Sequence, residues 1–221
     1  TIIISSEGIN GSISFLKKDL NKIKINIKKI FKISKFDNEN NVVTKFVPFL
    51  KGRVKLKKEV VPIGKKLKNR VKNNHLSPDQ WNKFILKKDS FIIDTRKEFE
   101  FKIGTFKNSI NPKINNFRNF SKYFRKYKKN SKIGMFCTGG IRCEKVSDYL
   151  KSKGYTNIFQ LKGGIINYLS KIEKKKSLWK GECFVFDNRV SVNHNLKSGN
   201  YSICAGCREP ISFKDKSSSK F

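Results

Sequence analysis

The sequence predicts an α/β fold, in which a parallel sheet with flanking helices follows a small α+β domain and precedes a short cysteine-containing tail. Two observations support this prediction. From residue 90 to 172, apolar strand-like runs alternate with helical patterns, and this alternation requires crossovers between parallel strands. Before residue 66, strand-like runs flank one helical pattern, which is typical of a small α+β sandwich. The 221 residues suit two modest domains with appendages.

Residues 1–66 predict the small α+β domain. The run TIIISSEGINGSISF reads as strand, turn and strand, with glycines in the turn to supply positive φ. Residues 18–33 form a basic amphipathic pattern and predict a helix lying on a small sheet, with apolar positions at Leu20, Ile23, Ile27 and Ile30. Residues 42–64 read as two strands around a Lys-Gly turn. The chain starts on a strand-like run without methionine, so we expect a partial domain.

Residues 67–86 predict a linker followed by a helix. The stretch KKLKNRVKNNH is polar and basic, as linkers often are. Ser77 then suits an N-cap and Pro78 the first helical position.

Residues 87–178 predict the parallel-sheet domain. Its strands are expected within 90–96, 132–142 and 155–164, and its helices at 143–154, which Gly154 ends, and at 165–172. Between these elements, Phe117, Phe120, Tyr123 and Phe124 are interleaved with basic residues. This spacing suits a helix that buries one face and also suits rings that stack on RNA bases. We favour the core interpretation.

The cysteine pattern of residues 179–221 allows a metal site. This segment reads as a β-rich extension, and Cys204 and Cys207 form one C-x2-C pair. A zinc site needs about four ligands. Cys183 or His194 could add ligands, although the spacing does not require it. Cys204 and Cys207 are therefore candidate zinc ligands that lack established partners.

The composition indicates a polyanion partner and reduced thiols. The net charge is +33, which favours RNA binding, although a Lys-, Ile- and Asn-rich coding bias explains part of the excess. Five cysteines without a secretory signal argue for a reducing, cytoplasmic location. No apolar window is long enough for a membrane helix, so no membrane partner is expected.

The loop from Cys137 to Arg142 is the candidate reactive site. It follows a predicted strand, and ligands of parallel sheets bind at the carboxyl ends of strands. Two glycines let backbone N–H groups converge, and the following helix start and Arg142 add positive potential. These features would lower the pKa of Cys137 and hold an anion within Thr138, Gly139, Gly140, Ile141 and Arg142.

The length of this loop favours sulfur over phosphate chemistry. Four residues separate Cys137 from Arg142, whereas tyrosine-phosphatase loops have five and surround a tetrahedral phosphate. The shorter loop suits a persulfide sulfur. The plain alternative is a buried structural cysteine, which is common. Cys143 reads either as a resolving thiol or as a packing residue, and we favour packing.

Two sets of motifs carry a family resemblance. FIIDTRKEFEFKIGTFKNSINP and CTGGIR resemble a rhodanese domain, although Gly104-Thr105 stands where rhodaneses usually have Gly-His. MFCTGGIRCEK, SSEGINGSIS, GRVKLKKEVVPIG, HLSPDQWN and WKGECFVFDNRV resemble the rhodanese-related tRNA uridine hydroxylase family along nearly the whole chain.

This resemblance implies a function and roles for named residues. It implies an oxidoreductase that hydroxylates wobble uridine 34 of tRNA at C5, with molecular oxygen as co-substrate and Cys137 as the persulfide-type active residue. It also implies a ferredoxin-like (acylphosphatase-like) fold for residues 1–66 and a second cysteine pair beyond residue 221, which would make a zinc site possible in the C-terminal region of the full-length protein. Neither a flavin fingerprint nor a haem ligand pair is evident, and the electron donor is unknown.

Other residues receive supporting roles, and other functions stay open. Asp94 and Arg96 are expected to support the loop through an ion pair or hydrogen bonds to backbone N–H groups. The basic cluster Arg53, Lys55, Lys57 and Lys58 reads either as a tRNA phosphate contact or as a solvated face. The alternative functions are a rhodanese-type sulfurtransferase with a persulfide on Cys137, and an RNA-binding module without activity.

Overall fold

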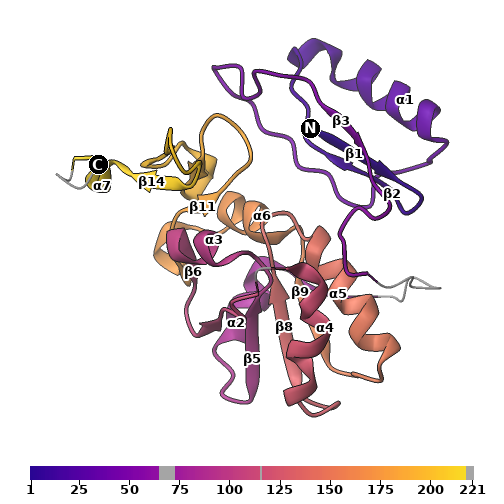
Figure 1. The fold of residues 1–221 in the computed structure, drawn as a ribbon, viewed down its shortest axis with the longest axis vertical. Coiled ribbons are helices and arrows are strands. Elements are labelled where there is room, and N and C mark those ends of the chain that lie inside the picture. Colours follow the sequence, from indigo (N-terminus) through magenta and orange to yellow (C-terminus); the bar gives the residue numbers. More distant parts are fainter. Residues whose placement is uncertain (65–72, 115, 218–221) are drawn as a thin grey trace. The chain divides into compact units, whose positions relative to one another are not determined.

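The computed structural model describes residues 1–64, 73–114 and 116–217, and the chain forms two compact units, Thr1–Val60 and Val61–Phe221 (Figure 1). The first part of the predicted linker, residues 67–72, lies outside the described residues. The domain boundaries predicted within the second unit stay predictions.

The first unit is a three-stranded sheet with one long helix. Strand β1 (Ile2–Ser5) lies in the centre, antiparallel to β2 (Gly8–Gly11) and parallel to β3 (Val54–Leu56). The predicted helix is present as α1 (Leu20–Phe31), preceded by a 3₁₀ turn (Lys17–Asp19). The strand-turn-strand and helix predictions are therefore confirmed.

Two details of the first unit differ from the prediction. Residues 42–50 form no strand; instead the Thr44 hydroxyl donates to the Phe46 carbonyl, and Pro48 has no N–H to donate to a ladder. Ile30 is 70% exposed, and Phe31 is half-buried in its place. The apolar period alone did not distinguish these two neighbouring residues.

The second unit is built on a five-stranded sheet in which every paired strand is parallel, as predicted. The strand order is β4-β9-β8-β5-β7. The strands are β4 (Asn74–Leu76), β5 (Ser90–Asp94), β7 (Ser109–Ile110), β8 (Lys132–Phe136) and β9 (Ile158–Leu161). Because β8 is central, its carboxyl end lies between two neighbouring strand ends, where parallel sheets bind ligands.

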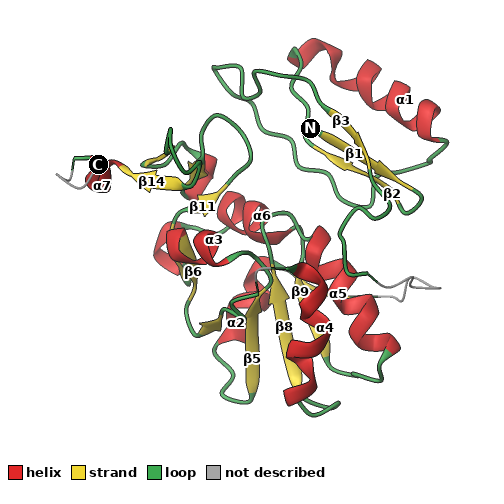
Figure 2. Cartoon of the chain, in the orientation of Figure 1, coloured by secondary structure: helices red, strands yellow, loops and turns green. Residues whose placement is uncertain are grey.

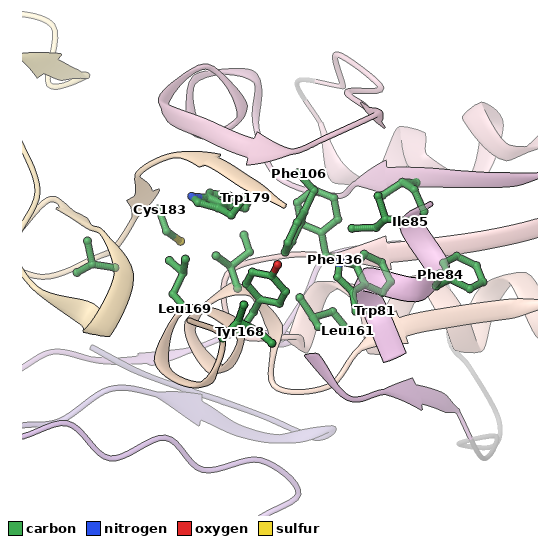
Figure 3. Close-up of a cluster of buried hydrophobic side chains, with 14 of the residues drawn as sticks. Trp81, Phe84, Ile85, Phe106, Phe136, Leu161, Tyr168, Leu169, Trp179 and Cys183 are labelled. Atoms are coloured by element: carbon green, nitrogen blue, oxygen red, sulfur yellow. The ribbon is translucent and has the colours of Figure 1, made fainter. Parts of the chain in front are cut away.

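Helices cover both faces of this sheet (Figure 2). Alternate strand residues point to opposite faces, so Phe136 packs with α2 (Pro78–Ile85) and α6 (Gly164–Lys171), whereas Met135 packs with α4 (Phe120–Tyr123) and α5 (Ile141–Ser152). Figure 3 shows the first of these clusters, in which Trp81, Phe106, Phe136 and Tyr168 meet. The result is a three-layer α/β/α arrangement.

Local signals explain where several helices begin and end. Ser77 caps α2 through a reciprocal capping box with Gln80, as the Ser-Pro start predicts. Gly154 adopts φ +82° just beyond α5, as expected for a helix stop. Phe120 and Phe124 are buried, which confirms the core interpretation of the aromatic run. They lie in α4 and the 3₁₀ turns beside it (Phe117–Asn119 and Phe124–Lys126).

The tail is paired with the body of the second unit. Strand β10 (Trp179–Gly181) pairs with β6 (Gly104–Phe106), which follows α3 (Glu98–Ile103). Trp179 lies in the core cluster of Figure 3. Short hairpins and turns follow: β11 (Cys183–Phe184), β12 (Ser191–Val192), β13 (Tyr201–Ile203), β14 (Pro210–Ser212), α7 (Phe213–Lys216) and the 3₁₀ turns Lys174–Lys176 and His194–Leu196. Across the described residues, no helix has the length and apolar character to cross a bilayer.

Candidate active site

Cys137 lies directly after β8 and before α5, at the carboxyl end of the central strand. Its side chain is buried, and its Sγ accepts the Gly140 N–H at 3.1 Å. Gly140 has φ +99°, a left-handed conformation that favours glycine. On the outer side, nothing lies within 4 Å of a Cβ placed on Gly139, and Ile141 is 38% exposed. The loop therefore encloses the Cys137 sulfur, while Gly139 and Ile141 lie on its accessible outer side.

The surroundings of Cys137 favour its thiolate. Burial alone would raise the pKa of the thiol. The hydrogen bond from the Cys143 thiol, the charge of Arg142 and the backbone N–H groups of Arg142 and Cys143 act in the opposite direction and lower the pKa of Cys137 to about 5. At neutral pH the loop therefore holds the reactive form of the cysteine.

Arg142 is held by Glu100, which the sequence interpretation did not include in the site. Its Nη1 and Nη2 donate to the Glu100 carboxylate at 2.7 and 2.9 Å, and Nη2 also donates to the Thr138 hydroxyl at 3.2 Å. Glu100 is 1% exposed. Burial would raise the pKa of Glu100, but the Arg142 charge and hydrogen bonds outweigh it and lower the pKa. This pair fixes the start of α5 to α3.

Cys143 packs beneath the loop, beside Thr95 at the end of β5. It is buried in the same cluster as Cys137, and its Sγ lies 3.4 Å from the Thr95 hydroxyl. Thr95 in turn donates its N–H and its hydroxyl to the Phe136 carbonyl, each at 3.0 Å. Burial, together with the hydrogen bond to Cys137, raises the pKa of Cys143 well above its ordinary value. Cys143 is thus a protonated donor to the Cys137 thiolate.

The first turn of α6 supports the loop from the other side. The Ile165 N–H donates to the Cys137 carbonyl at 3.0 Å, and the Ile166 N–H donates to the Thr138 carbonyl at 3.1 Å. Gly164 has φ +66°, and a Cβ there would lie 2.5 Å from both carbonyl oxygens. Gly163 and Gly164, at the start of α6, are the sequence signal for a close approach, but the sequence does not show which segment approaches them.

Asp94 and Arg96 form a buried ion pair at the end of β5. The Arg96 guanidinium bonds both carboxylate oxygens of Asp94, with the shortest contact at 2.6 Å, and its Nη2 donates to the Gly104 carbonyl at 2.6 Å. Asp94 and Arg96 flank Thr95, whose hydroxyl contacts Cys143. The bond from Arg96 to the Gly104 carbonyl fixes the start of β6, which follows α3. Its predicted role in supporting the loop stays a prediction.

The remaining candidate residues lie apart from the cysteine loop in the sequence. Arg53, Lys55, Lys57 and Lys58 are exposed on and beside β3, which is a single edge strand and not part of the hairpin that the sequence suggested. Arg53 and Lys57 bond β1 through their backbones. Their side chains are therefore accessible, and their contact with tRNA stays a prediction.

Cys204 and Cys207 lie in the turn between β13 and β14. Backbone N–H groups of Cys207 and Gly206 lower the pKa of Cys204. Among the residues that the structure describes, no group of three or more His, Cys, Asp or Glu side chains could hold a metal ion, so Cys183 and His194 do not complete a site with this pair. The donor set present, two thiols, falls short of the four ligands that zinc needs.

Two family models match the two parts of this architecture, and several solved structures are similar to part of the chain. A family model for a rhodanese-like domain matches residues 77–171, and one for a UPF0176 acylphosphatase-like domain matches residues 1–60. A rhodanese-related protein from Thermoplasma volcanium is 22% identical over 44% of this chain and 92% of that chain, with a TM-score of 0.38. A rhodanese-like domain protein from Staphylococcus aureus is 23% identical over 43% of this chain and 90% of that chain, with the same TM-score.

A curated relative matches the whole chain. The protein named tRNA uridine(34) hydroxylase from Pelagibacter ubique (strain HTCC1062) is 57% identical over 222 residues, which cover 100% of this chain and 74% of the relative. Both family models and the cysteine loop fall within the matched length. The chain belongs to the tRNA uridine(34) hydroxylase family.

Proposed function

We propose that this protein hydroxylates uridine 34 of tRNA at C5 and that Cys137 is its reactive residue. The name of the 57% identical relative supports the substrate and the reaction. The observation that carries the role of Cys137 is its position at the carboxyl end of the central strand, where its Sγ accepts the Gly140 N–H and where the Cys143 thiol and the Arg142 charge lower its pKa. Nucleophilic cysteines are found in such positively polarised loops.

The loop residues would each contribute to the reactivity of this sulfur. The backbone N–H of Gly140 and the protonated Cys143 stabilise negative charge on Sγ. Arg142 adds a fixed charge, and Glu100 and Thr138 hold its guanidinium in one orientation. Burial excludes bulk water from Sγ, so these interactions act in a medium of low dielectric constant.

The oxygen source is part of the proposal. Hydroxylation by molecular oxygen inserts one oxygen atom at C5 and reduces the other to water, which requires two electrons and two protons from a donor. The part that we propose for Cys137 is to supply an ionised sulfur within the reactive loop, and the electrons come from a separate reductant.

The decisive test is nucleoside mass spectrometry of tRNA from a strain that lacks this gene. We expect the wild-type gene to restore 5-hydroxyuridine and Cys137→Ser to restore none, because serine at this site is not ionised at neutral pH. Cys183→Ala is the control, since Cys183 is also buried but lies in the other core cluster. Full restoration by Cys137→Ser would remove Cys137 from the mechanism.

A rhodanese-type sulfurtransferase is the second candidate, and it is favoured by the short loop around a thiolate. In that reaction Cys137 would attack the outer sulfur of thiosulfate, form a persulfide and release sulfite, and an acceptor thiolate or cyanide would then remove the sulfur. Strong thiosulfate:cyanide activity, with tRNA nucleosides unchanged by deletion of the gene, would favour this alternative.

A further inference from the structure

A strongly basic surface covers α4 and the 3₁₀ turn that follows it. Between Lys113 and Lys132 the chain has eight basic residues and no acidic one. Six of the eight are exposed on α4, on its flanking 3₁₀ turns and just beyond them, and we call these six the α4 surface: Arg118, Lys122, Arg125, Lys126, Lys128 and Lys129.

The buried side of this segment fixes the α4 surface in place. Phe120 and Phe124 are 2% and 1% exposed and pack in the cluster that also contains Cys137 and residues of α5. The α4 surface therefore lies opposite an aromatic anchor that belongs to the same buried cluster as Cys137. Figure 1 shows α4 beside α5, the helix that begins at this loop, and contacts join these two helices.

Among the residues that the structure describes, no carboxylate neutralises the charge of the α4 surface. In the part of the chain that the structure describes, carboxylates pair with other cations, such as Lys102, Lys132 and Lys175, and none pairs with the α4 surface. Arg118 and Arg125 differ in this respect from Arg96, Arg142 and Arg189, which all pair with carboxylates. Exposed guanidinium groups without a carboxylate partner suit bidentate contacts with phosphate oxygens.

Aromatic rings hold two of these cations in defined positions. Lys126 Nζ lies 4.2 Å from the centre of the Tyr123 ring and 5.2 Å from that of Tyr127, and Lys129 Nζ lies 3.9 Å from the centre of the Tyr155 ring. Cation–π contacts restrain a lysine without neutralising its charge. Less conformational entropy is then lost when these groups bind a ligand.

We propose that the α4 surface binds the sugar-phosphate backbone of tRNA while the substrate uridine is presented to the Cys137 loop. This inference rests on the proposed function and adds the surface by which the substrate is held. A dense set of fixed cations without acidic residues is complementary to a polyphosphate chain. Such contacts set the position of the RNA and leave recognition of the base to the reactive site.

The test compares two triple variants of the whole protein. Arg118→Gln/Lys122→Gln/Arg125→Gln removes three charges from the α4 surface. The matched control, Lys174→Gln/Lys175→Gln/Lys176→Gln, removes three exposed charges from the 3₁₀ turn beside Glu173. Binding of an unmodified tRNA transcript with U34 is measured by filter binding at several KCl concentrations. Thermal unfolding and the ultraviolet absorbance of the Cys137 thiolate confirm that each variant is folded.

We expect the α4 variant to bind about tenfold or more weakly at low salt and the control to bind like wild type. The slope of log Kobs against log[KCl] should fall by about 2 to 3 in the α4 variant, since each lost phosphate contact accounts for roughly 0.7–0.9. An unchanged α4 variant, or an equal loss in both variants, overturns the proposal.

Three further outcomes separate this inference from its alternatives. If the α4 variant binds tRNA normally but loses binding to phosphatidylglycerol vesicles, the surface binds lipid and the proposal is wrong. If the wild-type protein shows no salt-dependent binding of tRNA, the proposed function itself fails. If wild type binds tRNA and both variants do too, only the α4 surface is excluded.

Discussion

Cys137 owes its ionisation to a few named neighbours, most of them close to it in the chain. The Gly140, Arg142 and Cys143 N–H groups come from the loop and the first turn of α5, and the Cys143 thiol comes from the same turn. A pKa lowered to about 5 against the effect of burial means that these dipoles and the Arg142 charge outweigh desolvation.

The pKa of Cys137 gives a direct prediction of pH dependence. Because thiolate forms above the pKa, the ultraviolet thiolate absorbance of wild type minus that of Cys137→Ser should rise with a midpoint near pH 5 and be nearly complete by about pH 7. The thiolate absorbance of an unperturbed cysteine would instead rise with a midpoint at about pH 8.5. A midpoint in that higher range would contradict the proposed stabilisation by the loop.

Glu100 gives a prediction about stability. Glu100→Gln leaves Arg142, 18% exposed, without its charged partner. Breaking a buried ion pair costs about 3 kcal/mol of unfolding free energy, measured by urea denaturation. Glu98→Gln on the same helix is the control, since Glu98 pairs with exposed Lys102 at 3.2 Å and such a pair contributes under about 1 kcal/mol. Equal small losses in both variants would show that Glu100 does not hold Arg142.

The sequence identified the residues of the loop but missed those that reach it from elsewhere. Cys137, Gly140 and Arg142 are adjacent, so their spacing alone suggested a site. Glu100 and Thr95 lie about 40 residues earlier, and only the pairing of β5 with β8 brings them to the loop. A carboxylate in a helix start reads as an ordinary capping residue, as Glu100 also is through the Lys97 N–H.

At the scale of elements, α6 supports the reactive loop as directly as α5 does. Its first N–H groups, which have no partners inside a helix, donate to the Cys137 and Thr138 carbonyls. This arrangement requires close approach of the two backbones, and only glycine at residue 164 allows it.

Gly164→Ala tests this support. The added Cβ would lie 2.5 Å from two loop carbonyls, so the loop must shift, and we expect 5-hydroxyuridine formation to fall at least about tenfold. Gly154→Ala is the control, because Gly154 also has positive φ but nothing lies within 4 Å of its Cβ position. That variant carries only the left-handed backbone cost of about 1–2 kcal/mol and should stay active. Equal activity of the two variants would show that the contact between α6 and the cysteine loop is not needed for the reaction.

Elements with strong local signals were predicted correctly. The Ser-Pro start of α2, the apolar core strands and the glycine after α5 each determine a boundary through their own backbone chemistry. The prediction of a strand at residues 42–50 was wrong. The β propensity of a segment does not show whether a neighbouring strand is free to pair with it, and here β3 occupies the second edge of β1. Long-range pairing, such as β10 with β6, left no sequence signal.

At the scale of the whole molecule, the net charge of +33 is distributed unevenly. No Asp or Glu occurs between Glu100 and Glu144, a stretch that contains both α4 and the cysteine loop. Composition alone did not separate coding bias from function. The α4 surface, which contains Arg118 and Arg125, allows the two explanations to be distinguished. If its charge is functional, removing charges there weakens tRNA binding more than removing the same number of charges elsewhere.

The central claim is that Cys137 is required for adding oxygen to uridine 34. The most direct measurement supplies oxygen-18 gas to cell extract containing the wild-type protein or Cys137→Ser, with an unmodified tRNA transcript, and reads the nucleosides by mass spectrometry. We predict 5-hydroxyuridine carrying the heavy isotope at position 34 with wild type and none with Cys137→Ser. Product formed equally by both proteins would contradict the claim.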